Sequence, residues 1–171
     1  MLPETVEKAM EMLGFGPERW LLVDVAAQEV ALLHGAAVIA TWPVSTAAVG
    51  VDARQDSGGT PPGIHRIAER IGAGGEAGAV FVSRERTGEV WRGERDPRDL
   101  ILGRILTLEG CQEGVNRGPG VDSLARYIYL HGTNHVDAVG SPCSHGCVRL
   151  RPADMLELFD RVEAGDPVVI A

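Results

Sequence analysis

The sequence predicts a single, mainly β domain, and three observations support this fold class. Gly (22) and Pro (10) are plentiful while aromatic residues make up only 5% of the chain, a composition typical of short elements joined by many turns. Short apolar runs rich in β-branched residues recur between segments rich in glycine, proline or charge. No repeat or linker divides the 171 residues, a length that one core can fill.

The N-terminus is predicted to be helical. Apolar side chains recur on one face of residues 3–13, and glycines follow. The face consists of Val6, Met10 and Leu13, with Pro3 near the start and Gly14 and Gly16 as the stop. We therefore expect residues 1–18 to form a helical extension and residues 19–171 to form the main domain.

The first strands are predicted to form a meander, because three apolar runs are separated by short turns. These strands span residues 19–26, 29–33 and 36–44. Proline cannot donate a hydrogen bond to a neighbouring strand, so Pro43 predicts that the third strand lies at a sheet edge.

The later elements alternate with glycine-rich loops at residues 50–63, 72–78 and 109–122. Residues 84–98 are densely charged, so we expect solvated surface there, with Trp91 packing inward. The run at 100–108 is apolar enough for a central strand, whereas residues 126–131 alternate like a half-buried strand. The remaining predicted elements are strands at 64–71, 79–83 and 166–171, and a helix at 152–164.

The charge balance and hydropathy exclude two classes of partner. The net charge is −8, from 16 Lys and Arg against 24 Asp and Glu, and such a chain would repel a nucleic acid. No apolar run approaches the roughly 20 residues that span a bilayer. The acidic N-terminus is not a secretory signal as it stands. The protein is therefore expected to be cytoplasmic if this is its native N-terminus, and to act outside the cytoplasm if a leader has been removed.

Chemistry concentrates in residues 131–151, which hold three of the five histidines and two of the three cysteines. An odd number of cysteines leaves at least one thiol unpaired within the chain. A nucleophilic thiol needs a base and donors for the oxyanion. We assign Cys147 as the nucleophile and His131 as its base. The backbone N–H groups of His145, Gly146 and Cys147 are the expected oxyanion donors.

Structural interpretations compete with this one. His34, His65 and His135 are expected to be structural, and an unpaired cysteine is often simply buried. A zinc site could use Cys143 and Cys147 with His131 or His145, but the spacing is not Cys-x₂-Cys and no second ligand pair appears. A Cys143–Cys147 disulfide would inactivate the nucleophile. We predict no metal and no cofactor.

The string at residues 144–150, SHGCVRL, resembles the SHGC(V/I)R signature of the L,D-transpeptidase (YkuD-type) catalytic domain. The HGT at residues 131–133 resembles the upstream element of the same family. Weaker likenesses occur at residues 22–25 with Gln28, at 43–46 (PVST, with Ala47 where glycine is frequent) and at 60–64 (TPPGI). Together they cover residues 20–171.

The resemblance implies a β-sandwich of mixed strands with a helix after the catalytic cysteine. It also implies that Cys147 attacks a peptidoglycan stem peptide to form a thioester, which passes to an amine acceptor. His131 would be held by the carbonyl of Gly132. Arg149 would bind a substrate carboxylate or form an internal ion pair. The remaining implied substrate-binding residues are Thr133, Ser144, which would also fix the loop, and His145, which would shape the groove.

Several functional alternatives stay open. Water in place of the amine would make the protein an L,D-carboxypeptidase of muropeptides, and loss of catalysis would leave a silent peptidoglycan-binding module. Cys143 stands where the family has a small apolar residue, which suggests redox sensitivity. Residues 72–78 and 110–120 are candidate gating loops. The sequence does not predict the oligomeric state.

Overall fold

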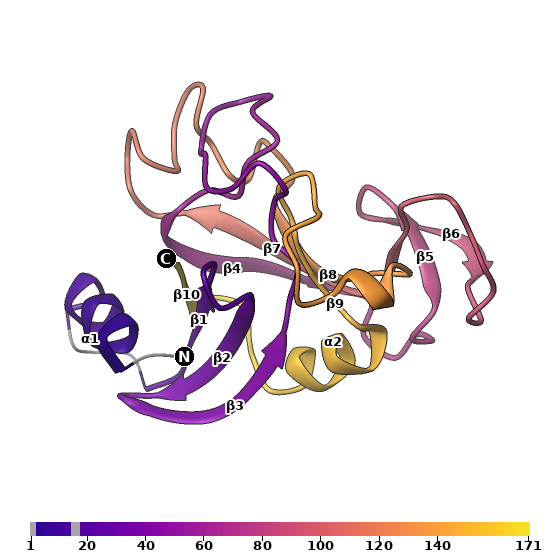
Figure 1. Cartoon of the computed structure of the whole chain (residues 1–171), viewed down its shortest axis with the longest axis horizontal. Coiled ribbons are helices and arrows are strands. Elements are labelled where there is room, and N and C mark those ends of the chain that lie inside the picture. Colours follow the sequence, from indigo (N-terminus) through magenta and orange to yellow (C-terminus); the bar gives the residue numbers. More distant parts are fainter. Residues whose placement is uncertain (1–2, 15–17) are drawn as a thin grey trace.

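The computed structural model describes residues 3–14 and 18–171, and within them ten strands form one mixed sheet flanked by two α-helices (Figure 1). In chain order the elements are α1 (Pro3–Met12), β1 (Trp20–Asp24), β2 (Glu29–His34), β3 (Ala37–Pro43), β4 (Gly63–Ile71), β5 (Ala79–Val82), β6 (Glu85–Val90), β7 (Ile101–Gly110), β8 (Tyr129–Gly132), the 3₁₀ turn η1 (Val136–Ala138), β9 (Val148–Leu150), α2 (Pro152–Phe159) and β10 (Pro167–Ile170).

The sheet follows the order β3-β2-β1-β10-β4-β7-β5-β6, and β8 branches from β7 to pair with β9. The pairs β1–β10 and β8–β9 are parallel, and the other neighbours are antiparallel. The predicted mainly β fold with mixed strands, an N-terminal helix and a helix after Cys147 is confirmed. The predicted meander is present as β1–β2–β3, and Pro43 ends the edge strand β3.

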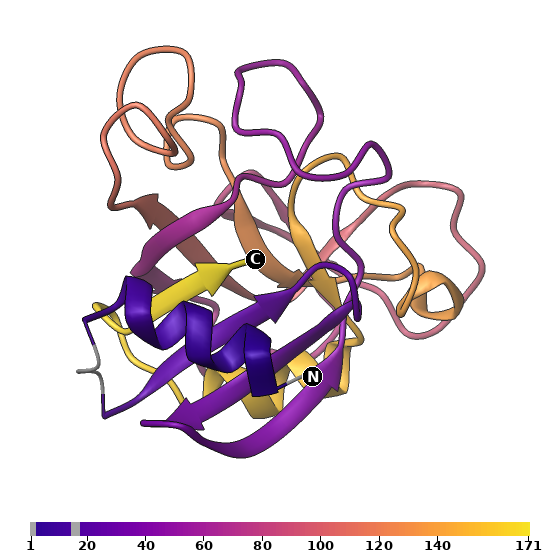
Figure 2. The same ribbon diagram turned by 60° about the vertical axis from the view of Figure 1, so that its left-hand side comes forward.

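The main core lies where α2 packs against β7 and β8. Met155, Leu158 and Phe159 of α2 are buried there with Val148 and Leu150 of β9. Figure 2 shows α1 crossing β1 and β2, where its Val6 and Ala9 join a second apolar cluster. The segment that carries Cys147 therefore runs directly into a strand and a helix that the core holds.

Two predicted element boundaries are wrong. The strand predicted at 126–131 begins only at Tyr129, because Tyr127 has φ 57° and breaks the extended chain. That strand is fully buried instead of half-buried, since β7 and β9 flank it and α2 packs on it. The second helix ends at Phe159, before Ala164, because the Gly165 N–H and the Asp166 carbonyl bond to Ile67 of β4.

The charged segment 84–98 is exposed as predicted over most of its length, but it contains strand β6, which the sequence analysis missed. Neither face of β6 is buried, so its sequence lacks the alternation of apolar and polar residues that predicts a strand. Trp91 packs against Val80, Leu100 and Leu102. Gly16, expected to stop α1, lies outside the described residues.

Candidate active site

His131 lies near the end of β8, where its ring is held by the backbone. The Nδ1 atom donates to the carbonyl of Gly132 at 2.7 Å. Because a carbonyl only accepts, this bond places the proton on Nδ1 and leaves a lone pair on Nε2. Burial lowers the pKa of His131 to about 4. The imidazole is therefore neutral near pH 7 and can accept a proton at Nε2.

Gly132 is required by the packing of β8 on β7. A Cβ at this position would lie 2.5 Å from the carbonyl oxygen of Leu102. Only glycine lets the two strands approach this closely. Gly132 thus allows β8, which carries His131, to approach β7 closely. Its carbonyl also orients the His131 ring.

The Cys147 thiol is also held by backbone groups. Its Sγ accepts a hydrogen bond from the Tyr129 N–H at 3.3 Å, and the thiol donates to the Tyr127 carbonyl at 3.4 Å. Burial raises the pKa of Cys147 to about 11, although the Tyr129 N–H and Arg149 act in the opposite direction. The Cys147 thiol and the His131 imidazole are therefore both neutral at rest.

The parallel pairing of β8 with β9 brings the expected residues together. It sets His131 opposite Arg149 and places Cys147 just before β9. His131 and Cys147 both line a cavity of about 180 Å³. The full lining consists of Asp99, Ile101, His131, His145, Cys147 and Arg149.

Arg149 is a buried cation that forms an ion pair with Asp99. An internal ion pair is one of the two roles expected for Arg149 from the sequence. Its Nε has no hydrogen-bond partner in the described parts of the chain. His145 is 87% exposed, and its Nδ1 lies 3.7 Å from Asp99 Oδ2. The sequence analysis did not identify Asp99, because it stands in a run of charged residues with no motif around it.

Ser144 and Thr133 are buried, and their hydroxyls are engaged within the protein. The Ser144 hydroxyl donates to the Cys147 carbonyl at 2.6 Å and accepts from the Gly146 N–H at 3.2 Å. The Thr133 hydroxyl accepts from the His135 N–H at 3.1 Å. Of the three expected oxyanion donors, the Gly146 amide is thus bonded to Ser144, while His145 and Cys147 remain candidates.

Gly146 can adopt its backbone conformation because it has no side chain. Its φ is +131°, and a Cβ would lie 3.1 Å from both the Gly59 carbonyl oxygen and Ile128. This conformation turns the chain just before Cys147. The sequence analysis expected a tight turn at this position for the same reason.

Two threonines from the weaker motifs hold the loop that carries Cys147. The Thr60 hydroxyl donates to the Gly146 carbonyl and accepts from the Ala47 N–H, both at 2.9 Å. The Thr46 carbonyl accepts from the N–H groups of Cys143 and Ser144, both at 2.9 Å. The TPPGI and PVST strings therefore act as anchors of the SHGC loop, a role that their sequence did not reveal.

Replacing Thr60 by valine should destabilise this loop. The change keeps the shape of the side chain but leaves the buried Ala47 N–H and Gly146 carbonyl without the hydroxyl, at a cost of about 1–3 kcal/mol. We expect the melting temperature to fall by several degrees. Thr41→Val on exposed β3 is the matched control. Equal melting temperatures for the two variants would contradict this anchoring role.

Replacing Asp99 by asparagine should make the Cys147 thiol more acidic. The Asp99 carboxylate raises the pKa of Cys147 and Arg149 lowers it, so removing the carboxylate leaves the cation uncompensated. The rate of iodoacetamide alkylation at Cys147, followed by peptide mass mapping, should reach half its maximum at a lower pH than in the unaltered protein. Asp154→Asn should leave that midpoint in place, and an unchanged midpoint in Asp99→Asn would contradict the coupling.

All three cysteines are unpaired, so the Cys143–Cys147 disulfide is not formed. Across residues 3–14 and 18–171, no group of three or more His, Cys, Asp or Glu side chains could hold a metal ion. His65 is buried between the Gly63 carbonyl and the Ser123 hydroxyl, and His135 Nε2 donates to the Arg98 carbonyl. No helix in the described chain is long and apolar enough to span a membrane.

The fold and the cavity define a mainly β enzyme domain with a cysteine and a histidine at the ends of adjacent strands. The profile of the L,D-transpeptidase catalytic domain, YkuD, matches residues 18–170. The chain belongs to this family.

Solved structures with the same fold include three L,D-transpeptidases. One from Mycobacterium smegmatis is 22% identical with a TM-score of 0.52, and the match covers 91% of this chain and 59% of that one. L,D-transpeptidase 3 from Mycobacterium tuberculosis is 14% identical with a TM-score of 0.56, covering 91% and 62%. A mutant of the Enterococcus faecium enzyme is 16% identical with a TM-score of 0.55, covering 91% and 50%. The chain thus spans about three fifths of the length of the first of these structures. No curated protein sequence matches.

Proposed function

We propose that this protein is a peptidoglycan L,D-transpeptidase that forms a thioester on Cys147 and passes the acyl group to an amine. The observation that carries the proposal is the pairing of two neutral groups, the Cys147 thiol and the Nε2 base of His131, in one cavity. Membership of the L,D-transpeptidase family supports the same reaction. In this proposal residues 19–171 are the catalytic domain and residues 1–18 are a helical extension.

In the first half of the reaction, the thiol proton moves from its bond to the Tyr127 carbonyl to Nε2 of His131. The sulfur attacks the carbonyl carbon between an L-centre and a D-centre of the stem peptide, and the carbonyl oxygen becomes an oxyanion. The N–H groups of His145 and Cys147 stabilise that oxyanion. The C–N bond then breaks, and the leaving amine of the terminal D-residue takes the proton from Nε2.

In the second half, an amine of a neighbouring stem attacks the thioester. It gives a proton to Nε2 as the new C–N bond forms, and the C–S bond breaks. The sulfur recovers the proton, which returns the neutral pair. The Gly132 carbonyl keeps Nδ1 protonated throughout, so each transfer uses Nε2.

The neighbouring residues have supporting roles in this proposal. Arg149, with Asp99 as its counterion, places positive charge beside the cavity and favours the thiolate that forms transiently. His145, exposed at the mouth, contacts the substrate. Ser144 and Thr133 fix the loops on either side. In this proposal the protein acts on the periplasmic or wall-facing side of the membrane, where stem peptides are cross-linked.

The test is mass spectrometry of a disaccharide-tetrapeptide incubated with the protein, with and without an amine acceptor. We expect release of the terminal D-residue and a cross-linked product when the acceptor is present. If tripeptide is the only product while the acceptor is in excess, the protein is an L,D-carboxypeptidase that uses the same thiol, and not a transpeptidase. Failure to consume the tetrapeptide under either condition would overturn the proposed function and leave a silent binding module.

A further inference from the structure

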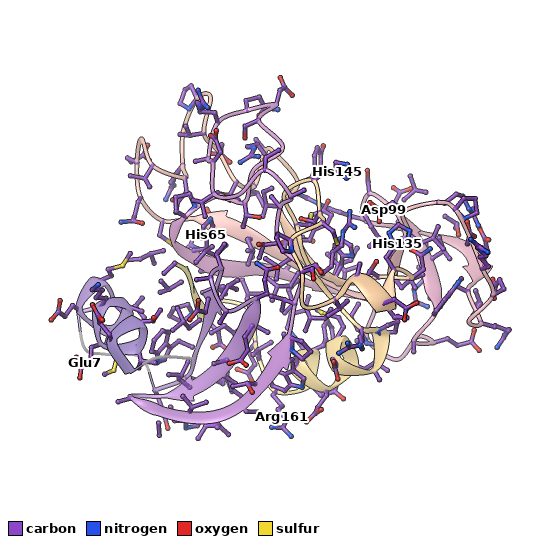
Figure 3. All side chains as sticks on the ribbon, viewed as in Figure 1. Glu7, His65, Asp99, His135, His145 and Arg161 are labelled. Atoms are coloured by element: carbon purple, nitrogen blue, oxygen red, sulfur yellow. The ribbon has the colours of Figure 1, made fainter. Side chains whose placement is uncertain are left out.

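A second cavity, of about 540 Å³, lies between residues 91–96 and residues 134–138. It is separate from the cavity that contains Cys147, but the two are linked through neighbouring residues. Asp99 of the first cavity follows this segment in sequence, and Asn134 and His135 follow the HGT element of His131. In Figure 3 the labels of His145, Asp99 and His135 follow one another between the middle of the view and the β5–β6 hairpin.

Trp91 supplies an aromatic wall to this cavity. Its Nε1–H donates to the Glu94 carbonyl at 2.8 Å, and its ring packs on the apolar cluster beneath. The orientation of the indole is therefore fixed before any ligand arrives. Trp91 is also half-buried, whereas Trp20 and Trp42 are 0% and 4% exposed.

Exposed charged side chains line the same cavity. Arg95 and Asp137 are both exposed and line the cavity. Neither side chain takes part in a hydrogen bond or an ion pair within the described chain. The backbone of the two segments that line the cavity is held together by Asn134. Its side chain accepts from the Leu100 N–H and donates to the carbonyls of Asp96 and Arg98.

These features select a class of ligand. The Arg98 carbonyl accepts from both Asn134 and His135, and the Asp96 carbonyl accepts from Asn134. Only one acceptor position of these two carbonyls is therefore left for a peptide strand. The same cavity also offers the Trp91 ring, the Asp137 carboxylate and the Arg95 guanidinium to a ligand. A sugar ring matches this set, with a flat C–H face for the indole and hydroxyl or amide groups for Asp137 and Arg95.

We propose that this cavity is a saccharide subsite that holds the glycan part of a peptidoglycan fragment while its stem peptide occupies the cavity of Cys147. The inference rests on the proposed function for the identity of the attached stem. Saccharide binding itself is a separate property that can be measured without any turnover.

The first experiment titrates the protein with an uncharged β-1,4-linked N-acetylglucosamine tetramer and follows tryptophan fluorescence. We expect a saturable change that Trp91→Phe abolishes, because the other two tryptophans are buried. Asp137→Ala should weaken binding about tenfold, the loss expected for one hydrogen bond to a charged group, whereas Asp154→Ala should not. Absence of a saturable change in the unaltered protein would overturn the proposal.

The second experiment compares kcat/KM for a disaccharide-linked tetrapeptide with that for the free tetrapeptide. Asp137→Ala should reduce the preference for the linked donor about tenfold and leave the free peptide unaffected. An unchanged preference would overturn the saccharide subsite, while turnover of neither donor by the unaltered protein would overturn the proposed function instead. As a control, a carbapenem should label Cys147 to the same extent in Asp137→Ala and in the unaltered protein, which would show that the substitution leaves the catalytic cavity intact.

Discussion

Replacing Cys147 by alanine is expected to reduce acyl transfer by at least about 10⁴-fold, because removal of a nucleophile leaves only binding and the oxyanion donors. The change removes one sulfur atom that contacts backbone groups of Tyr127 and Tyr129. We expect the fold to persist, which circular dichroism can check. The measurement is the rate at which a tetrapeptide donor loses its terminal D-residue.

Cys143→Ala provides the matched control for that variant. Cys143 lies in the same loop but does not line the cavity of Cys147 and His131. Its activity should stay within about threefold of the unaltered protein, since its side chain takes no part in the proposed steps. Activity in Cys147→Ala comparable to that in Cys143→Ala would refute the assignment of the nucleophile.

Replacing His131 by glutamine is expected to lower the rate of acylation of Cys147 by about 10²–10⁴-fold, the range for loss of a general base. Glutamine can still donate to the Gly132 carbonyl but cannot accept the thiol proton. The assay is acylation by a carbapenem followed by intact mass. His34→Gln, an exposed change on β2 far along the sheet from β8, is the control. A loss of less than about tenfold for His131→Gln would exclude His131 as the base.

The pH dependence of acylation tests the environment of the same ring. Burial lowers the pKa of His131 to about 4, so the base stays unprotonated until the pH falls through that value. The acylation rate should therefore show no loss centred near pH 6.5, where an ordinary histidine becomes protonated, and should fall only on further acidification. A midpoint near 6.5 in the rate profile would contradict the buried, neutral imidazole.

Local sequence patterns were sufficient to predict much of the fold, and they drew attention to two residues that the structure brings to one cavity. The meander, the edge position of Pro43 and the central strand β7 follow from runs of apolar residues whose burial is set locally. Cys147 and His131 stood out because each lies in a short string that contains a glycine, SHGC and HGT. Parallel pairing of β8 with β9 then brings them to one cavity.

The parts that could not be predicted depend on long-range contacts. Thr60 and Gly146 are 86 residues apart, and Asp99 reaches Arg149 across 50 residues, so no local pattern indicates either contact. The end of α2 was misplaced because Ile67, on a distant strand, bonds to Gly165. Strand β6 was missed because both of its faces are solvated, which removes the alternation that marks a strand.

The most direct test of the central claim is to incubate the protein with imipenem and locate the adduct by peptide mapping. We predict one adduct per chain, attached to Cys147, present in Cys143→Ala and absent in Cys147→Ala. An adduct on Cys143 or Cys111, or no adduct on the unaltered protein, would contradict Cys147 as the nucleophile.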